Sequence, residues 1–511
     1  MTHRAAVPAR SYDVVVLGGG LGPRIAAALL ARRGARTLVL AGDEPAPCYD
    51  VAGYRLPREP VGLLVGASGL ARRVLAELAV SSTLRTRSSV GEPPAQIAMP
   101  STRLDLAVDE PAFAAHLDRE WPGSVAAILT SLRTLDGIAR AVDAVLVAGA
   151  PWPPETFLEK RRHARALERW LQSRAASSDP LEPVPASHPW RASCRALVRF
   201  CTDLDADPSP VVLARALSAW RHGPVRFEGG FGAMHALLAE RIERSGGEVR
   251  DDERPARIVV RRGIVEGVEL RARGELVGAR CVVAGLDASS IAALCSERTA
   301  FEALFERQGE PDPRWYRYVL NVVIGRRGLP VGMGRDLVWL GDPRGTSVDD
   351  APLRVEATPL EGRDEVLLTV EALLSRRVAE DADGSLATVR ERVLASLGQV
   401  VPFLGRHVRL VDSPHDGREP VDLRQRVVLS VPAGCRRGPS TMRPIWHVRQ
   451  PRVLGTCAMP VRTPVRGLLS CGPDVVPGLG VEGAFVAAVA VARAVGATTG
   501  RRWSAARARL P

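Results

Sequence analysis

Residues 12–40 change twice between a strand pattern and a helix pattern. The apolar run 12–17 predicts a buried strand, and it is followed at once by a glycine-rich turn at residues 18–22. An alanine-rich stretch then extends to Arg33, and Gly34 ends the predicted helix. The apolar run 37–40 predicts a second buried strand. The pattern therefore predicts a strand, turn, helix and strand in close succession.

Similar patterns return in the middle and near the end of the chain. A helix is predicted over 233–244, and two alternating runs, 256–260 and 263–270, predict a hairpin. The apolar run 281–285 predicts another buried strand. The last such segment, 467–495, reads as a strand, a Gly/Pro turn and a long helix of small residues. Three separate stretches of chain thus carry strand and helix patterns of one kind.

The stretches between them have a different character. Residues 111–175 show helical periodicity, interrupted by the Pro-rich run 151–154, and residues 177–189 are rich in Pro and Ser. Strand patterns dominate 315–375, and a helix is predicted over 385–396. These stretches predict a second region of mixed helix and strand.

Composition limits the class of protein. A chain of 511 residues is expected to form two or three domains, and 46% hydrophobic with 25% charged residues is ordinary globular composition. All but one of the 69 basic residues are arginine, Lys160 being the exception, and they are scattered among the acids. The net charge of +12 therefore does not predict nucleic-acid binding. The arginine-rich tail, 501–509, is read as a solvated terminus, with a membrane or partner contact as the alternative.

The eight cysteines form no C-x-x-C pair and no His/Cys spacing suited to zinc, so we expect reduced thiols and no metal site. No apolar segment precedes the first strand, and no signal peptide is expected. The late apolar run 483–492 is too short to span a bilayer. The sequence predicts a cytoplasmic protein, with a peripheral position at the inner face of the membrane left open.

Four segments fall in the order and spacing of one known family. They are residues 13–40, 227–249, 257–270 with 279–289, and 467–488. Together they resemble the phytoene-desaturase-like FAD oxidoreductases, which are related to carotenoid isomerases and amine-oxidase-type flavoproteins. The resemblance covers both ends and the middle of the chain. The remaining stretches agree with the family only in general character.

The resemblance implies an α/β fold in which a discontinuous FAD/NAD(P)-binding Rossmann-like domain carries an inserted α+β substrate domain. The implied boundaries are 1–75, 225–290 and 455–511 for the dinucleotide-binding domain and 76–224 and 291–454 for the substrate domain. It also implies an apolar tunnel over the flavin for a polyene or lipid-like substrate. The oligomeric state is left undecided.

Cofactor contacts follow from the same resemblance. A glycine backbone approaches a pyrophosphate closely, and a helix N-terminus offers it free N–H groups. The cofactor-binding positions implied are Gly18, Gly20, Leu21, Gly22, Arg24, Asp43, Pro255, Gly472, Asp474, Gly480, Val481 and Glu482. No catalytic residue is nominated, because the flavin carries the redox chemistry in such enzymes.

Three positions depart from the family pattern. Ala41 replaces the acidic residue that binds the adenosine ribose, and Asp43 is the substitute considered. Pro255 lacks the N–H that would contact the adenine. Pro473 displaces the ribityl-binding carboxylate by one residue, to Asp474. We therefore expect FAD binding to be weak.

Other candidates are weaker. His235, His222, Arg226 and the pair Trp446-His447 are considered as cleft or substrate contacts, with a structural role favoured for each. The leading prediction is a flavin-dependent oxidoreductase of the desaturase or isomerase type. The alternatives left open are a non-catalytic descendant that binds lipid or acts as a scaffold, and a protein for a different dinucleotide.

Overall fold

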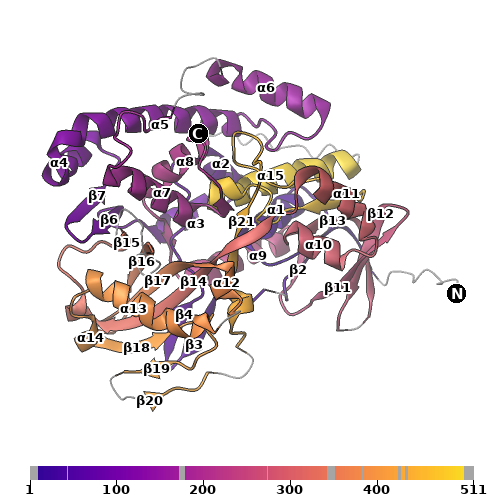
Figure 1. Ribbon diagram of the computed structural model, residues 1–511. Coiled ribbons are helices and arrows are strands. Elements are labelled where there is room, and N and C mark those ends of the chain that lie inside the picture. Colours follow the sequence, from indigo (N-terminus) through magenta and orange to yellow (C-terminus); the bar gives the residue numbers. More distant parts are fainter. Residues whose placement is uncertain are drawn as a thin grey trace.

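The computed structural model describes residues 10–42, 44–171, 179–272, 274–341, 351–381, 384–423, 427–431 and 435–499. The candidate Asp43 and the arginine-rich tail lie outside these residues. Two large sheets organise the chain, with a layer of helices across one side of the molecule (Figure 1).

The first sheet is built from three distant stretches of chain. Its order is β10-β2-β1-β13-β12-β11, and β22 also pairs with β13. The strands are β1 (Arg10–Leu17), β2 (Thr37–Leu40), β10 (Glu248–Arg250), β11 (Pro255–Arg261), β12 (Ile264–Leu270), β13 (Leu276–Ala284) and β22 (Leu468–Ser470). Strands β10, β2, β1, β13 and β22 run parallel, whereas β11 and β12 form the predicted hairpin. The discontinuous Rossmann-like domain is therefore confirmed.

Three helices cover one face of this sheet. Helix α1 (Leu21–Arg32) packs against both α9 (Gly230–Arg244) and α15 (Gly480–Thr499). Helices α10 (Ala288–Leu294) and α11 (Thr299–Gln308) share a second core with the other face. Among the described residues one helical segment, Pro477–Ala497, is long and apolar enough to cross a membrane, and 67% of its apolar window is buried. That burial is what a core helix of small residues requires.

The second sheet belongs to the inserted region. Its order is β20-β19-β18-β14-β17-β16-β15-β6-β7, with β21 on β14 and β8 on β21. The strands are β6 (Ala95–Met99), β7 (Thr102–Leu106), β8 (Leu204–Asp205), β14 (Asp312–Gly325), β15 (Asp336–Trp339), β16 (Leu353–Pro359), β17 (Glu365–Ser375), β18 (Val408–Asp412), β19 (Val421–Asp422), β20 (Val427–Val428) and β21 (Arg443–His447). Two short ladders, β3 (Cys48–Val51) with β4 (Tyr54–Pro57) and β5 (Ser88–Ser89) with β9 (Arg226–Phe227), complete the strands.

Helices of the inserted region lie mainly above this sheet (Figure 1). They are α2 (Gly69–Glu77), α3 (Ser81–Thr86), α4 (Glu110–Glu120), α5 (Val125–Val147), α6 (Phe157–Leu171), α7 (Pro189–Cys201), α8 (Pro210–His222), α12 (Arg376–Ala379), α13 (Val389–Val400) and α14 (Leu404–His407). The Pro-rich run 151–154 separates α5 from α6, as predicted. The predicted helix 385–396 differs at its start, because Ser385–Thr388 forms a 3₁₀ turn before α13.

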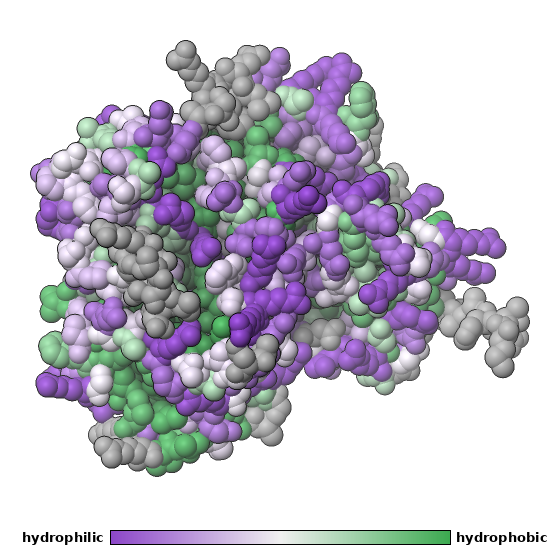
Figure 2. Space-filling model, in the orientation of Figure 1, coloured by the Kyte–Doolittle hydropathy of each residue, from purple (hydrophilic) through white to green (hydrophobic). Residues whose placement is uncertain are grey.

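Polar residues cover most of the face in Figure 2, and hydrophobic ones gather at its lower edge, over β18 to β20. Val427 and Val428 of β20 are exposed there, as is Leu423.

Candidate functional site

A cavity of about 370 Å³ lies where the two sheets meet. Its walls come from the turn before α1, the start of α15, and strands β14, β17 and β21. Small-molecule sites in proteins usually measure about 300–1,000 Å³, so this cavity is at the low end of that range. Its position is the one expected for a ligand of a discontinuous Rossmann-like domain.

The glycine turn lines one end of this cavity. Gly20 is the N-cap of α1, and Gly20, Leu21, Gly22 and Pro23 all contribute to the wall. Pro23 stands where the family has a third glycine. A Cβ atom on Gly285, which follows β13, would lie 2.4 Å from the Pro23 ring, so Gly285 makes the room that Pro23 needs. The turn therefore keeps its close approach to the sheet.

The carboxylate of Glu44 lies on this turn. A Cβ atom added to Gly18 or Gly20 would be 3.4 Å from its Oε1 atom. The backbone N–H groups of Gly20 and Gly19 donate hydrogen bonds to it. Burial raises the pKa of Glu44, while these hydrogen bonds and the nearby Arg24 charge oppose the rise. An anionic side chain thus already uses the N–H groups that a phosphate would need.

The neighbouring region, where the adenosine of a dinucleotide would extend, is closed by side chains and backbone. Arg24 is buried, with its Nε donating to the Gly19 carbonyl at 2.7 Å and its Nη2 2.5 Å from Asp251. A Cβ atom on Gly42 would lie 2.8 Å from the carbonyl oxygens of Asp252 and Glu253. None of these residues lines the cavity.

Ala41 and Pro255, the two residues that depart from the family pattern at the adenosine end, are both buried. Ala41 is 5% exposed and its Cβ lies 3.0 Å from a Cβ atom placed on Gly19. Pro255 opens β11, as predicted, and pairs with Leu270 of β12. It is buried in the sheet and does not line the cavity.

At the opposite end, Gly472 and Pro473 line the cavity but Asp474 does not. The Asp474 side chain is fully buried, and its Oδ2 accepts the backbone N–H of Ala288 at 2.8 Å, at the start of α10. Burial raises the pKa of Asp474 to about 7. The one-residue displacement has therefore directed this carboxylate toward the domain interior.

At the start of α15, too, some of the predicted cofactor-binding residues line the cavity and one does not. Gly480 and Val481 line the cavity, whereas Glu482 forms a buried ion pair with Arg215 of α8. The Arg215 Nε atom donates to Glu482 Oε2 at 2.8 Å. Glu482 thus joins the helical layer to the dinucleotide-binding domain.

Charged residues form the wall contributed by the second sheet. Arg317 of β14 lies 2.5 Å from Glu371 of β17 and 3.2 Å from Asp203, and Arg443 of β21 pairs with Asp203 and with Glu59. The same cavity is also lined by apolar residues, which are Leu21, Phe231, Val319, Val476, Val481 and Ala484. The cavity therefore combines an apolar lining with a charged end.

None of the tryptophans whose side chains the structure describes lines this cavity. Trp152, Trp190 and Trp220 are at most 2% exposed and belong to the main hydrophobic core. The side chain of Trp170 lies outside the described residues. Trp152, Trp190 and Trp220 thus stabilise the helical layer by packing.

Of the candidate histidines, His235 lines the cavity, and burial with the nearby Arg24 charge lowers its pKa to about 4. His222 is exposed beside Ser218, and the ring of His447 contacts Asp205. Arg226 is buried with Asp336 and Glu356, as a structural ion pair.

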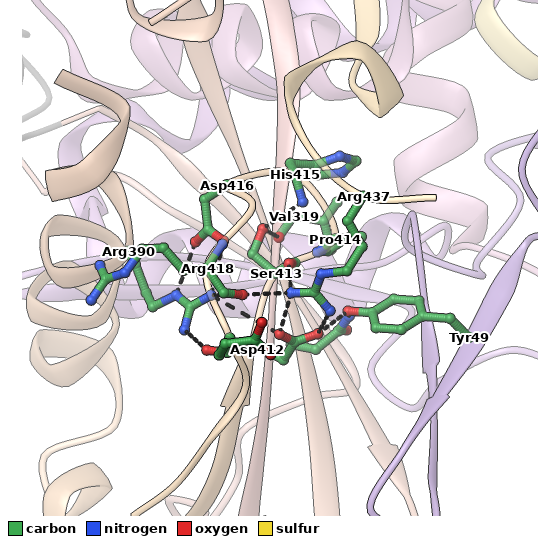
Figure 3. Close-up of polar contacts among 12 residues, drawn as sticks. Tyr49, Val319, Arg390, Asp412, Ser413, Pro414, His415, Asp416, Arg418 and Arg437 are labelled. Carbon is green, nitrogen blue, oxygen red and sulfur yellow. Dashed lines mark hydrogen bonds and ion pairs between the residues drawn. The ribbon is translucent and has the colours of Figure 1, made fainter. Parts of the chain in front are cut away.

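A second histidine, His415, lines the cavity from the loop after β18. Figure 3 shows the buried network that holds this loop. Asp412 accepts the Tyr49 hydroxyl at 2.6 Å and both Nη atoms of Arg437, at 3.0 and 2.7 Å. The Ser413 hydroxyl donates to the Val319 carbonyl at 2.7 Å and accepts the His415 N–H at 3.1 Å.

The imidazole of His415 is 2% exposed, and its Nδ1 lies 2.9 Å from the Thr441 hydroxyl. Burial and the Arg58 charge lower the pKa of His415 to about 3. Both cavity histidines are therefore neutral at physiological pH, which suits them to hydrogen bonding rather than to taking a proton.

Sequence reasoning did not find Glu44, Arg58 or His415. Glu44 stands next to the position considered, Asp43, but no motif marks it. His415 lies in a Pro/Gly-rich segment between two strands, which reads as an ordinary loop. The polar composition of the loop around His415 is the only sequence feature that marks it. That composition does not predict that the His415 side chain faces the cavity.

No family model matches the sequence, and no curated protein is similar to it. Solved structures are similar in fold. An oxidoreductase from Methanosarcina mazei is 18% identical over 94% of this chain and 99% of its own, with a TM-score of 0.55. Cyclohexylamine oxidase from Brevibacterium oxydans is 17% identical over 96% and 100%, with a TM-score of 0.54. A putrescine oxidase double mutant is 15% identical over 96% and 99%, with a TM-score of 0.55.

These likenesses show that the chain shares its fold with these three proteins over nearly its whole length. The narrower resemblance to the desaturases stays a prediction.

Proposed function

We propose that this chain is a flavin-dependent oxidoreductase with FAD as its cofactor. One observation carries the proposal: the glycine turn before α1 and the helix start at Gly480 line the same cavity. These are the two places where a Rossmann-like flavoprotein holds the phosphate and flavin ends of one extended ligand. The fold shared with the oxidoreductases above supports the same assignment.

The residues at the site fit such a ligand in chemistry. The Glu44 carboxylate lies against the turn, whose N–H groups also suit a phosphate. Gly472, Pro473 and Val481 line the other end, where a flavin ring would lie. When bound, a flavin supplies hydride and electron transfer, and the protein orients the substrate and excludes water.

The cavity also suggests a substrate class. The resemblance to desaturases and isomerases proposes an apolar or polyene body. The charged end, with Arg317 and Glu371, suits a polar group at one terminus of that body. We therefore propose a lipid-like substrate with a polar end. A peripheral membrane contact, from which such a substrate is reached, remains part of this proposal.

A second function is favoured by the closed adenosine region. The Arg24–Asp251 pair and the close contacts of Gly42 fill part of this region, and none of these residues lines the cavity described above. This is expected of a descendant that has lost the cofactor, because the adenosine region is then free to fill with side chains. Such a protein would bind an apolar ligand or serve as a scaffold.

We expect the purified protein to contain substoichiometric flavin or none, and to take up added FAD weakly, because Glu44 uses the phosphate site and the adenosine contacts are missing. The measurement is the visible absorption spectrum, with mass analysis of the supernatant after denaturation. A stoichiometric yellow protein would contradict weak binding. No uptake of added FAD would favour the non-catalytic function.

A further inference from the structure

Glu44 differs from the other acidic residues of this site because its half-buried carboxylate lies at a helix N-terminus. Its two backbone donors, Gly19 and Gly20, belong to the phosphate-binding turn. A Cβ atom on Gly19 would lie 3.3 Å from its Oε2, which places both carboxylate oxygens over the turn. The helix dipole stabilises one negative group at this place.

Two anions cannot use the turn together. The same N–H groups cannot serve both a carboxylate and a phosphate, and their like charges repel at contact distance. A phosphate-bearing ligand therefore binds this turn only after the Glu44 side chain has moved away.

A second observation points to an anionic ligand at the same place. Arg24, in the first turn of α1, is 5% exposed, and its Nη1 atom has no hydrogen-bond partner in the part of the chain that the structure describes. A buried guanidinium N–H without an acceptor is costly. Its Nη2 atom lies 3.3 Å from a Cβ position on Gly19, next to the turn. A phosphate at the turn would lie beside this guanidinium, whose Nε and Nη2 atoms are both at Gly19.

The backbone around Glu44 permits the movement. Gly42 is anchored by its N–H to the Glu253 carbonyl at 3.0 Å, and Ala46 by its carbonyl to Arg58 Nε at 2.9 Å. Glu44 lies between these anchors, outside the regular helices and strands. Its side chain can leave the turn while both anchors stay in place.

We propose that Glu44 is an internal occupant of the phosphate-binding turn, which a phosphate-bearing dinucleotide must displace, so that Glu44 sets the affinity for the cofactor. The inference rests on the proposed FAD-dependent function. On this proposal, weak FAD binding has two causes: the missing ribose and adenine contacts, and the Glu44 side chain.

The test compares wild type, Glu44→Ala and Glu44→Gln by calorimetric titration with FAD, ADP and riboflavin. We expect Glu44→Ala to bind FAD and ADP about tenfold more tightly or better, because the turn is then free for phosphate. Glu44→Gln should gain less, since its amide oxygen still accepts an N–H. Riboflavin, which has no phosphate, should bind all three proteins equally.

Asp50→Ala is the control, because it removes an exposed carboxylate from the adjacent strand β3. It should leave every affinity unchanged, and thermal melts should show that all variants fold. If wild type and Glu44→Ala bind FAD and ADP equally, the role of Glu44 is refuted while the flavoprotein function stands. If no variant binds FAD, both proposals fail.

Discussion

Replacing Arg215 with methionine is expected to lower the free energy of unfolding by about 3–5 kcal/mol, the usual cost of breaking a buried ion pair. Methionine keeps most of the side-chain volume, so the loss isolates the charge interaction. It leaves the Glu482 carboxylate, whose side chain is 5% exposed, without its cation. Arg215 also donates to the Ala139 carbonyl of α5 at 3.0 Å, so three helices lose a common contact.

The Glu482→Leu variant should lose less free energy of unfolding than Arg215→Met. In Glu482→Leu, Arg215 keeps Asp143 at 3.5 Å and the Ala139 carbonyl. The double variant Arg215→Met/Glu482→Leu should cost less than Arg215→Met alone, because no buried charge remains unpaired. Urea unfolding of the three variants measures these differences.

Glu240→Ala is the control for this series. It breaks an exposed i,i+4 pair with Arg244, for which we expect a loss of about 0.5 kcal/mol or less. A loss below about 1 kcal/mol for Arg215→Met, close to that of the control, would contradict the ion pair's role.

The Asp474→Asn variant is expected to become more stable relative to wild type as the pH rises from about 4 to 8. The folded protein holds a proton on Asp474 up to a pKa of about 7, whereas the unfolded chain releases it near the ordinary value of 3.8. Between these values the unfolded state binds fewer protons, so the stability of wild type falls as the pH rises. The full contribution is about 4 kcal/mol, at about 1.4 kcal/mol per pKa unit.

Asparagine cannot ionise, so this loss is absent in the variant, and its Oδ1 atom can still accept the Ala288 N–H. Unfolding free energies of both proteins at several pH values give the difference directly. Asp364→Asn, at an exposed site, should keep the pH dependence of wild type. Parallel stability curves for wild type and Asp474→Asn would show that Asp474 is already ionised when folded.

The sequence by itself determined the elements of the dinucleotide-binding domain. Strand β1, the glycine turn, α1 and β2 follow from local patterns: a continuous apolar run, residues that permit a tight turn, and a helical period ending at Gly34. The β11–β12 hairpin and α15 were predicted in the same way. Their assembly into one sheet was implied by the resemblance to a known family.

Only the tertiary structure decided which side chains face the cavity. Asp474 and Glu482 stand at positions that the resemblance assigned to the cofactor, yet each is held by a group from a distant element, the Ala288 N–H and Arg215. His415 reaches the cavity because the buried network around Asp412 fixes its loop (Figure 3). Glu44 returns to the glycine turn because its segment is anchored to Glu253 on one side and to Arg58 on the other. Local patterns predict strands and helices because their periods are set within a few residues. The direction of a side chain in a loop depends on contacts hundreds of residues away, which no local pattern records.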